Sequence, residues 1–452
     1  MRRLWSDPNP APDPCAVIPE ADRLHPTNCE EQHHVSDTPG ATTPAGTDGA
    51  ETERPLTILI GADTFAPDVN GAARFAERLA AGLVERGHDV HVMAPAASRK
   101  HGTWKEVHEG QEVTAHRLRS WRWYPHDWLR FALPWRIKQN SARVIDAVKP
   151  DVVHFQSHIV VGRGLSVEAQ KRGIRIIGTN HFMPENMLEF TLLPKSVQDF
   201  AVGLAWKAAG RTFGRAEAVT TPTRKAAQFL EKHTGLENVH AISCGIDAHK
   251  YSPDWEPRTE NRILFVGRVT GEKHIDVLLR ALTLLPAELD AKVEIVGGGD
   301  QLRNLQHLAS ELGIAERVTF TGYVTDDELR EAYHRASVLA MPSIAELQSI
   351  VTMEAMASAL PVVAANAMAL PHLVHDGENG YLFEPGSHQD LAAKLRAVLE
   401  ASPDEYRAMK EESIRLIAAH DIQRTLSTFE SLYRGKPVTD PVTDVAPVAL
   451  PE

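Results

Sequence analysis

Residues 56–95, LTILIGADTFAPDVNGAARFAERLAAGLVERGHDVHVMAP, decide the fold class. The run LTILIGAD (56–63) is apolar enough for a short buried strand. FAERLAAGLVERG (75–87) has the amphipathic spacing of a helix that ends at Gly87, and HDVHVMAP (88–95) predicts the next strand. A strand, a helix and a strand in about forty residues form a βαβ unit, which implies a parallel sheet.

The same alternation continues along the chain in two series. Short apolar runs rich in β-branched residues predict further strands, and helical stretches separate them. The first series contains DVVHFQ (151–156), IRIIGTNH (174–181) and AVTTPT (218–223), and the second contains NRILFVGR (261–268), KVEIVGGG (292–299), RVTFTGYV (317–324), SVLAMPS (337–343), PVVAAN (361–366) and GYLFEP (380–385). The pattern predicts an α/β protein with two doubly wound, Rossmann-like domains. Ligands of such folds bind at the carboxyl ends of the strands, so we expect the site in the cleft between the domains.

Changes in composition predict the domain boundaries. Both ends of the chain are rich in Pro, Asp and Thr and lack a hydrophobic period, which predicts disorder. SCGIDAHKYSPDWEPRTEN (243–261) has the composition of a linker, and about 405–433 has the period of one amphipathic helix. The predicted parts are a disordered tail (1–54), an N-terminal, acceptor-side domain (55–240), a C-terminal, nucleotide-sugar-binding domain (241–415), a C-terminal helix packing back on the N-terminal domain (416–435) and a second disordered tail (436–452).

Composition excludes several classes of protein. The formal net charge of −12 over 452 residues argues against general binding of nucleic acid. No apolar run approaches the roughly 18–20 residues of a membrane-spanning helix, and MRRLWSDPNPAPDPC (1–15) lacks the apolar core of a secretory signal. Three cysteines, Cys15, Cys29 and Cys244, form neither a disulfide framework nor a zinc motif. A cytoplasmic protein without a metal site is expected.

Two glutamates eight positions apart stand out in ELQSIVTMEAMASALPVVA (346–364). Eight residues advance a helix by about 800°, which leaves Glu346 and Glu354 roughly 80° out of line. We therefore expect Glu346 in a loop and Glu354 early in the following helix. The amides of Ser349, Ile350 and Val351 would then form a helix N-terminus, which suits an anion.

Cations and a glycine stand at two other predicted strand ends. In FVGRVTGEKHIDVLLRAL (265–282), Arg268 ends a strand and Lys273 precedes an apolar helix, as a diphosphate site would require; a solvated pair is the alternative. Gly71 begins the first helix, where backbone can approach a phosphate, although a plain βα turn has the same pattern. No GxGxxG fingerprint of a nicotinamide site is present. Phosphate-binding cations together with hydroxyl-binding acids indicate a nucleotide sugar.

These motifs resemble the retaining glycosyltransferases of family 4, which have the GT-B fold. The resemblance covers about residues 56–435 and rests on FVGRVTGEKHIDVLLRAL (265–282), GYVTDDEL (322–329), MPSIAELQSIVTMEAMASALPVVAAN (341–366) and LVHDGENGYLFEPG (373–386). It implies a hexosyltransferase with a front-face mechanism, in which the leaving phosphate takes the proton of the acceptor. It also implies that no metal or other cofactor is needed at the diphosphate.

The resemblance assigns roles to residues of the second domain and to one residue of the first. Arg268 and Lys273 would hold the diphosphate, Glu346 would contact the transferred sugar, and Glu354 would accept hydrogen bonds from the ribose. The donor-binding set is completed by Gly71 at the diphosphate, by Tyr323, Val324 and Asp326 at the base, and by Ser349, Ile350 and Val351 at the sugar and phosphates. This chain departs from the family in having Asn70-Gly71 in place of a glycine pair and Ser349 in place of a common glycine.

The catalytic histidine of the first domain is left open. Many family members have His-x-His at a strand end, but HFQSH (154–158) has Gln156 at the second position. By this resemblance His158 and His181 are the catalytic candidates, with His154 as a third. Each of them could equally be an ordinary buried or surface histidine.

An aromatic and basic segment in the first domain predicts the acceptor side. RLRSWRWYPHDWLRFALPWRIKQ (117–139) holds four of the eight tryptophans among six cations: Trp121, Trp123, Trp128, Trp135, Arg117, Arg119, Arg122, Arg130, Arg136 and Lys138. Such a mixture suits an anionic membrane interface; stacking on single-stranded nucleic acid and packing as an interior loop are the alternatives. A second apolar stretch that ends in basic residues, 185–215, belongs to the same domain.

The sequence therefore predicts a retaining hexosyltransferase that uses UDP- or GDP-activated glucose, mannose or galactose. The expected acceptor is a membrane glycerolipid or phosphoinositide, and the expected location is the inner face of the plasma membrane, with contact through 117–138. The alternatives are a glycosyltransferase with a soluble acceptor, a GT-B nucleotide-sugar epimerase and an inactive nucleotide-sugar-binding protein.

Overall fold

The computed structural model describes residues 54–68, 70–122, 130–184, 194–256 and 258–439. The predicted tails therefore fall almost entirely outside the described residues, as do Cys15, Cys29, Trp123 and Trp128. The described residues form two α/β halves, each built on its own sheet, as the alternating pattern predicts.

The first half contains an eight-stranded sheet in the order β10-β9-β8-β7-β1-β2-β4-β3. All neighbouring strands are parallel except β3 and β4. The strands are β1 (Thr57–Gly61), β2 (Asp89–Pro95), β3 (Gly102–His108), β4 (Gln111–Leu118), β7 (Val152–Phe155), β8 (Arg175–Thr179), β9 (Ala218–Thr221) and β10 (His240–Ala241). The helices of this half are α1 (Gly71–Glu85), α2 (Ile137–Val148), α3 (Val161–Lys171), α5 (Lys195–Phe213) and α6 (Arg224–Thr234).

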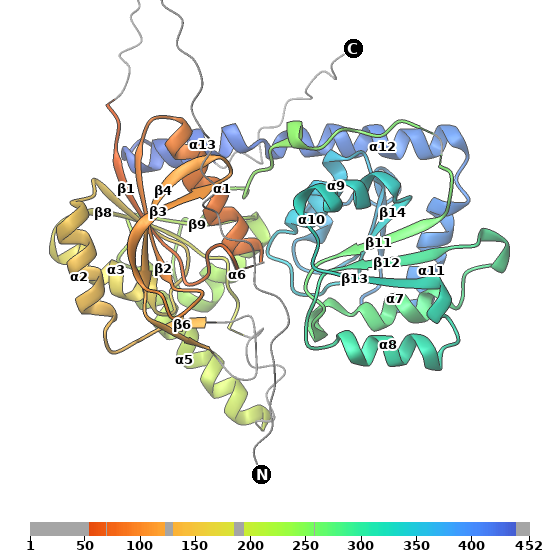
Figure 1. The fold of residues 1–452 in the computed structure, drawn as a ribbon, viewed down its shortest axis with the longest axis horizontal. Helices are drawn as coiled ribbons and strands as arrows, with labels where there is room; N and C mark the ends of the chain where they lie inside the picture. The colour runs from red at the N-terminus through yellow and green to blue at the C-terminus, as the bar shows by residue number, and fades with distance from the viewer. Residues whose placement is uncertain (1–53, 69, 123–129, 185–193, 257, 440–452) are drawn as a thin grey trace, which may run out of the picture. The chain divides into compact units, whose positions relative to one another are not determined.

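Strand β1 shows why helices cover both faces of this sheet. Successive side chains of a strand point to opposite faces. Ile58 and Ile60 pack in one apolar cluster with Phe75 of α1, whereas Leu59 packs in another with Leu165 of α3. Figure 1 shows the sheet between these helices. The continuous apolar sequence of β1 follows from burial on both faces.

The β3–β4 hairpin has no counterpart in the predicted pattern. Its two-residue turn, Glu109-Gly110, has φ of 49° and 79°, the positive values of the turns that fit the twist of a hairpin. Short strands also pair within the aromatic segment, where β5 (Ser120–Arg122) and β6 (Arg130–Ala132) form an antiparallel ribbon.

The second half contains a six-stranded, fully parallel sheet in the order β13-β12-β11-β14-β15-β16. Its strands are β11 (Arg262–Val266), β12 (Lys292–Val296), β13 (Val318–Gly322), β14 (Val338–Met341), β15 (Val362–Ala365) and β16 (Gly380–Phe383). Its helices are α7 (Ile275–Leu282), α8 (Leu302–Glu311), α9 (Asp326–Arg335), α10 (Ile350–Ala357) and α11 (His388–Leu399). In Figure 1 this sheet lies between α9 and α10 on one side and α7 and α8 on the other.

The prediction of one continuous helix over 405–433 is wrong. The chain forms α12 (Pro403–Ile417) and α13 (Ile422–Tyr433), separated by a short 3₁₀ turn (Ala418–His420). The buried His420 imidazole bonds the Ser243 hydroxyl at 2.9 Å, and the His420 carbonyl accepts from the amide of Ile246 at 2.8 Å. The Asp421 side chain then caps α13. These contacts with the linker interrupt a helix that its amphipathic period alone would continue.

Candidate active site

A cavity of about 1050 Å³ lies where the carboxyl ends of the two sheets face each other. Its walls come from the loops after β1, β7 and β8 in the first half and after β11, β12, β13 and β14 in the second. The predicted site residues that line it are Gly71, His181, Arg268, Lys273, Tyr323, Val324, Asp326, Glu346, Ser349, Ile350, Val351 and Glu354. His158 is absent from the wall.

Both predicted phosphate-binding cations already contact carboxylates in this cavity. Arg268 lies just beyond β11, whose last residue is Val266, and its Nη2 donates to Oε1 of Glu272 at 3.1 Å. Lys273 ion-pairs with the half-buried Glu346. The sequence did not predict a role for Glu272 at this site. The one feature that could have indicated it is its position between Arg268 and Lys273 in the sequence. The acids hold the cations at the cavity wall, where a diphosphate would compete for them.

The loop that carries Glu346 is tied down from two directions. The carbonyl of Leu347 accepts from the Thr223 hydroxyl at 3.0 Å, and Oε1 of Gln348 accepts from the amide of Cys244 at 2.7 Å. Helix α10 follows without a side-chain cap, and the hydroxyl of Ser349 accepts a hydrogen bond from the hydroxyl of Thr352. The first turn of α10 lines the cavity, so its N–H groups suit an anionic ligand.

Glu354 lies inside α10 and is almost fully buried. Its Oε2 accepts from the Tyr333 hydroxyl at 3.0 Å, and its Oε1 accepts from Nη2 of Arg78 at 2.8 Å. One turn earlier on α1, Arg74 pairs with Asp326 at 2.7 Å. Neither arginine was predicted. The available signal was their i, i+4 spacing on the helix that begins at Gly71.

Gly71 begins α1 at the cavity, as predicted. Where the family often has two glycines, this chain has Asn70 before Gly71, and Asn70 has a structural role of its own. Oδ1 of Asn70 accepts from the amide of Ala73 at 2.9 Å and caps the helix. A Cβ added at Gly71 would lie 3.7 Å from Ile350, an ordinary van der Waals contact, so the space at this position does not by itself require glycine.

Only one of the three candidate histidines lines the cavity. His181 does so, and its Nε2 bonds Oε1 of Gln156, another wall residue, at 2.9 Å. His154 lies in β7 behind the wall and bonds the Tyr433 hydroxyl at 2.7 Å. His158 packs on Phe182 and Phe213, and its buried Nδ1 has no hydrogen-bond partner among the described residues.

Burial keeps these histidines neutral. It lowers the pKa of His181 to about 3, that of His154 to about 3 and that of His158 to about 4. In the same wall, burial raises the pKa of Asp63, and hydrogen bonds from Ser157 and the amides of Val160 and Val161 oppose the rise. Asp63 therefore acts as an acceptor that holds the loop before α3.

Sequence comparison identifies the family. A model described as glycosyl transferases group 1 matches residues 250–415, and a model described as glycosyltransferase family 4 matches residues 69–250. The chain belongs to glycosyltransferase family 4. Its two facing Rossmann-like halves form the GT-B fold, so the predicted fold class is confirmed.

Relatives of this family 4 chain carry several activities in their names. The sulfoquinovosyl transferase SQD2 of Arabidopsis thaliana is 28% identical over 60% of this chain and 53% of its own length, so the chain spans about half of that relative. A GDP-mannose-dependent alpha-mannosyltransferase of Mycolicibacterium smegmatis is 28% identical over 73% of this chain and 84% of its own. The solved structure of Anabaena Alr3699/HepE with UDP and glucose has a TM-score of 0.67 at 18% identity, covering 84% of this chain and all of that one (100%).

The aromatic segment of this family member is partly buried and partly exposed. Arg117 was expected on a membrane-facing surface, and this is wrong: it is buried in β4 and bonds Oε2 of Glu106 at 2.6 Å. Trp121 and Trp135 are 39% and 66% exposed, with ring centroids 5.3 Å apart. Phe131, in β6, lines the cavity. The segment therefore joins the cavity wall to an exposed aromatic surface; residues 123–129 lie outside the described residues.

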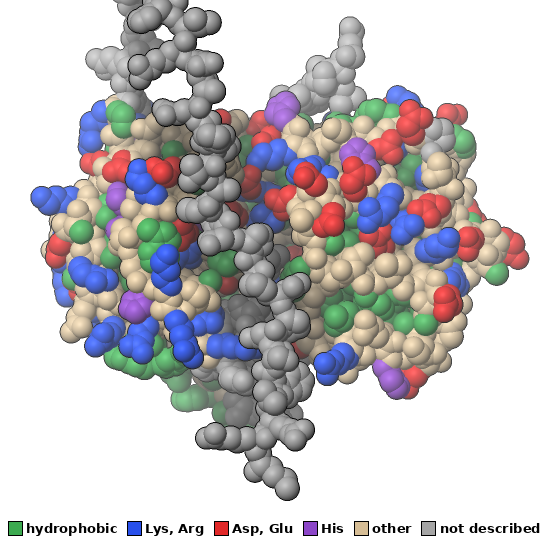
Figure 2. All heavy atoms as spheres, viewed as in Figure 1, with side chains coloured by type: hydrophobic (Ala, Val, Ile, Leu, Met, Phe, Trp, Pro, Cys, Tyr) green, Lys and Arg blue, Asp and Glu red, His purple; other side chains and the backbone are tan. Residues whose placement is uncertain are grey.

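Helix α5 adds an exposed apolar stripe to the same half. Val197, Phe200 and Leu204 are 45%, 69% and 51% exposed and share one helix face by their spacing. Figure 2 shows Lys and Arg side chains beside hydrophobic ones along the lower edge of this half. Residues 185–193, which precede the helix, lie outside the described residues. Within the described part of the chain, no helix is long and apolar enough to cross a membrane.

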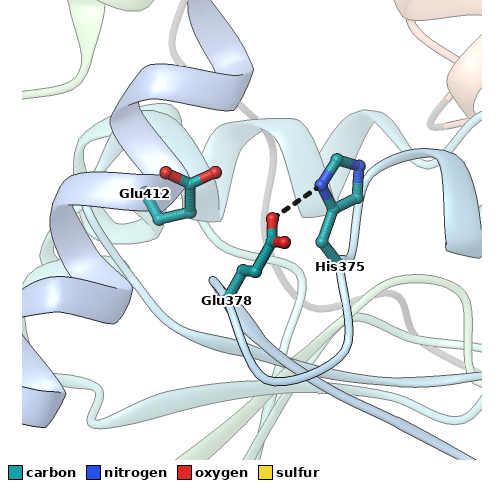
Figure 3. Close-up of side chains that lie close together, drawn as sticks. All are labelled: His375, Glu378 and Glu412. Atoms are coloured by element: carbon teal, nitrogen blue, oxygen red, sulfur yellow. Dashed lines mark hydrogen bonds and ion pairs between the residues drawn. The ribbon is translucent and has the colours of Figure 1, made fainter.

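One surface cluster in the described residues has the composition of a metal site. His375, Glu378 and Glu412 place one ligand atom each within 4.8 Å of one another (Figure 3). His375 already bonds Glu378 at 3.1 Å, and Glu412 pairs with Arg415. None of the three lines the cavity, so the cluster is not placed to assist a diphosphate.

Proposed function

We propose that this protein is a retaining hexosyltransferase that moves a sugar from a nucleotide sugar to an acceptor. The observation that carries the proposal is the convergence, in one cavity, of the Arg268–Lys273 pair, the first turn of α10 and Glu354. Cations and amides suit a diphosphate, and a buried carboxylate suits the hydroxyls of a ribose. The names of relatives include GDP-mannose, and a neighbouring structure contains UDP, so either base is a candidate.

Stabilisation of the leaving nucleotide would be the main catalytic work. The charge that develops on the diphosphate would be shared by Arg268, Lys273 and the α10 amides, and removal of one such donor typically costs about a hundredfold or more in rate. Glu346, held beside Lys273, would accept from hydroxyls of the transferred sugar. A pKa near 3 makes His181 a weak base, so we assign it a hydrogen bond to the sugar rather than proton abstraction.

Retention of configuration is proposed without an enzyme nucleophile. Three acids of the wall are already engaged: Asp63 by Ser157, Glu346 by Lys273 and Glu354 by Arg78 and Tyr333. This arrangement supports a front-face reaction. The bond from the anomeric carbon to the leaving phosphate breaks, the acceptor oxygen bonds the same face, and a phosphate oxygen takes the acceptor's proton.

We also propose that the diphosphate needs no divalent metal, because Arg268, Lys273 and the α10 amides supply the positive charge. Activity should then persist in a chelator. A chelator-sensitive reaction restored by Mg²⁺ or Mn²⁺ would contradict this part of the proposal.

The acceptor we propose is a membrane glycerolipid or phosphoinositide presented at an anionic membrane surface. The exposed Trp121 and Trp135 beside cations, and the apolar stripe of α5, support peripheral binding. Phe131 connects this surface to the cavity. A soluble acceptor would need no such surface.

A donor screen tests the proposal. Purified protein would be incubated with UDP-glucose, UDP-galactose or GDP-mannose, with and without mixed lipid vesicles, and release of nucleoside diphosphate would be measured. We expect one donor to be hydrolysed slowly alone and faster with the acceptor lipid, with the α-anomer as product. Absence of turnover and of binding for all three donors would overturn the proposal.

A further inference from the structure

Helix α1 presents two arginines to the donor side of the cavity, and burial distinguishes them. Arg74 and Asp326 are 33% and 58% exposed, so solvent screens that pair. Arg78 and Glu354 are 13% and 7% exposed. A buried pair is poorly screened, and loss of one partner leaves the other charge uncompensated. Arg78 therefore influences the carboxylate of Glu354 more strongly than Arg74 influences that of Asp326.

The Glu354 carboxylate is held at both oxygens and still has acceptor capacity. Arg78 donates to Oε1 from the first half of the molecule, and Tyr333 donates to Oε2 from α9. An ionised carboxylate offers about four acceptor positions, two on each oxygen. Arg78 and Tyr333 take two of these positions and the Tyr251 hydroxyl lies close enough to take a third, so the carboxylate keeps acceptor capacity for a ribose hydroxyl.

The protonation states of the cluster favour this arrangement. Burial opposes the charge of Arg78, but Glu354, together with Tyr251 and Glu109, outweighs it and raises the pKa of the guanidinium. Burial, and then the charge of Glu354, raise the pKa of Tyr333, which stays a neutral hydroxyl donor. The carboxylate accordingly faces the guanidinium of Arg78 and the hydroxyls of Tyr333 and Tyr251.

Arg78 also has an unused donor at the cavity. Its Nη1 is buried and makes no hydrogen bond to any residue that the structure describes, and Arg78 lines the cavity wall. Buried donors are normally satisfied, so an orphaned one in a ligand-sized cavity indicates that the ligand supplies the acceptor. A ribose oxygen or a phosphate oxygen close to Glu354 would do so.

We propose that Arg78 is a positioning residue for donor binding, which orients Glu354 toward the ribose from the opposite half and donates from Nη1 to the bound nucleotide. The inference rests on the proposed function. It makes nucleotide affinity depend on a residue of the acceptor-side half, so the contact between α1 and α10 becomes part of the donor site.

Calorimetric titration with UDP and GDP, and with their 2′-deoxy forms, tests this role in the full chain. The better nucleotide should bind wild type about tenfold or more tightly than its 2′-deoxy form, the order expected for one charged hydrogen bond. Arg78→Met should weaken the ribonucleotide about tenfold and reduce its preference over the deoxy form. Arg86→Met is the matched control, because Arg86 directly follows the last residue of α1 and pairs with Glu430 outside the cavity.

A double variant separates a loss of nucleotide binding from a loss of folding. Arg78→Met leaves Glu354 buried and unpaired, whereas Arg78→Met with Glu354→Gln leaves a neutral amide. In the Glu354→Gln background, Arg78→Met should weaken the nucleotide less than it does in wild type, because the carboxylate that Arg78 positions is gone and only its own donation from Nη1 is lost. If wild type binds neither nucleotide, the proposed function and this inference both fail. If wild type binds one and Arg78→Met retains its affinity and ribose preference, the role of Arg78 alone is overturned.

Discussion

Nε2 of His181 lies 2.9 Å from Oε1 of Gln156, and both side chains line the cavity. The amide oxygen accepts, so the neutral imidazole carries its proton on Nε2. Gln156 stands where many family members have a histidine, and here it orients the histidine of the neighbouring strand end. This hydrogen bond in the cavity wall distinguishes His181 from His158. The sequence around His158 is that of a catalytic residue, but its ring packs among aromatic side chains.

Replacement of these two histidines should therefore have different effects on transfer. His181→Phe removes the proposed hydrogen bond to the sugar and should lower turnover by about tenfold or more. His158→Phe should stay within about threefold of wild type, because the ring lies outside the cavity wall. Initial rates at saturating donor compare the two. A large loss in His158→Phe with normal folding would return the catalytic role to His158.

Stability should fall as the pH drops from about 7.5 to 5.5. His154, His158 and His181 have lowered folded pKa values, so between about 4 and 6.5 the unfolded chain binds protons that the folded chain does not. Each such histidine should contribute about 1 kcal/mol to the loss over this interval. Urea denaturation at several pH values measures it. His158→Phe should flatten the dependence; an unchanged slope would mean that His158 has the same pKa in the folded and the unfolded protein.

Loss of either phosphate-binding cation should slow the reaction severely. Arg268→Ala and Lys273→Ala should each reduce turnover at least about a hundredfold, the order for one transition-state donor. Lys292→Ala is the control, because Lys292 pairs with Asp290 away from the cavity. Steady-state rates within threefold of wild type for both cavity variants would refute the diphosphate assignment.

Glu354→Gln should weaken the donor more than it slows chemistry. A ribose contact is present in both the ground state and the transition state, so its loss raises KM and the nucleotide Kd rather than lowering kcat. The loss should be about 1.5–3 kcal/mol for a charged hydrogen bond. Calorimetric titration of the nucleoside diphosphate decides, and unchanged affinity would show that Glu354 only supports the fold.

The exposed aromatic surface should bind anionic vesicles even though the chain carries a net charge of −12. Each cation near such a surface contributes about 1 kcal/mol that salt screens, whereas tryptophan anchoring resists salt. Trp121→Ala with Trp135→Ala should abolish the salt-resistant part of binding and leave hydrolysis of the donor intact. The matched control is Trp255→Ala, an exposed tryptophan of the linker.

Co-sedimentation at low and high salt provides the measurement for the vesicle prediction. Phe200→Ser tests the stripe of α5 in the same assay, and we expect it to weaken binding without affecting donor hydrolysis. Wild-type protein that stays in the supernatant at low salt would contradict the lipid proposal and favour a soluble acceptor.

The sequence by itself determined the parallel strands of the two sheets and most of the donor wall, whereas the antiparallel hairpin of β3 and β4 had no signal in it. Strand and helix periods are local, and parallel strands necessarily bring their carboxyl ends, with the loops that follow, to one edge. Residues of short motifs such as Arg268 and Lys273, or Glu346 and Glu354, therefore reach the cavity from spacing alone.

Only the tertiary structure decided which residues meet across the cavity. Arg78 and Glu354 are 276 positions apart, and their contact depends on which face of α1 is turned toward α10. The choice of His181 over His158, the burial of Arg117 and the break before α13 likewise follow from packing against distant segments. A periodic pattern predicts that one face of a helix or strand is buried. It does not predict which residues that face contacts, because the charges and hydrogen-bonding groups on the other side come from side chains that are remote in the sequence.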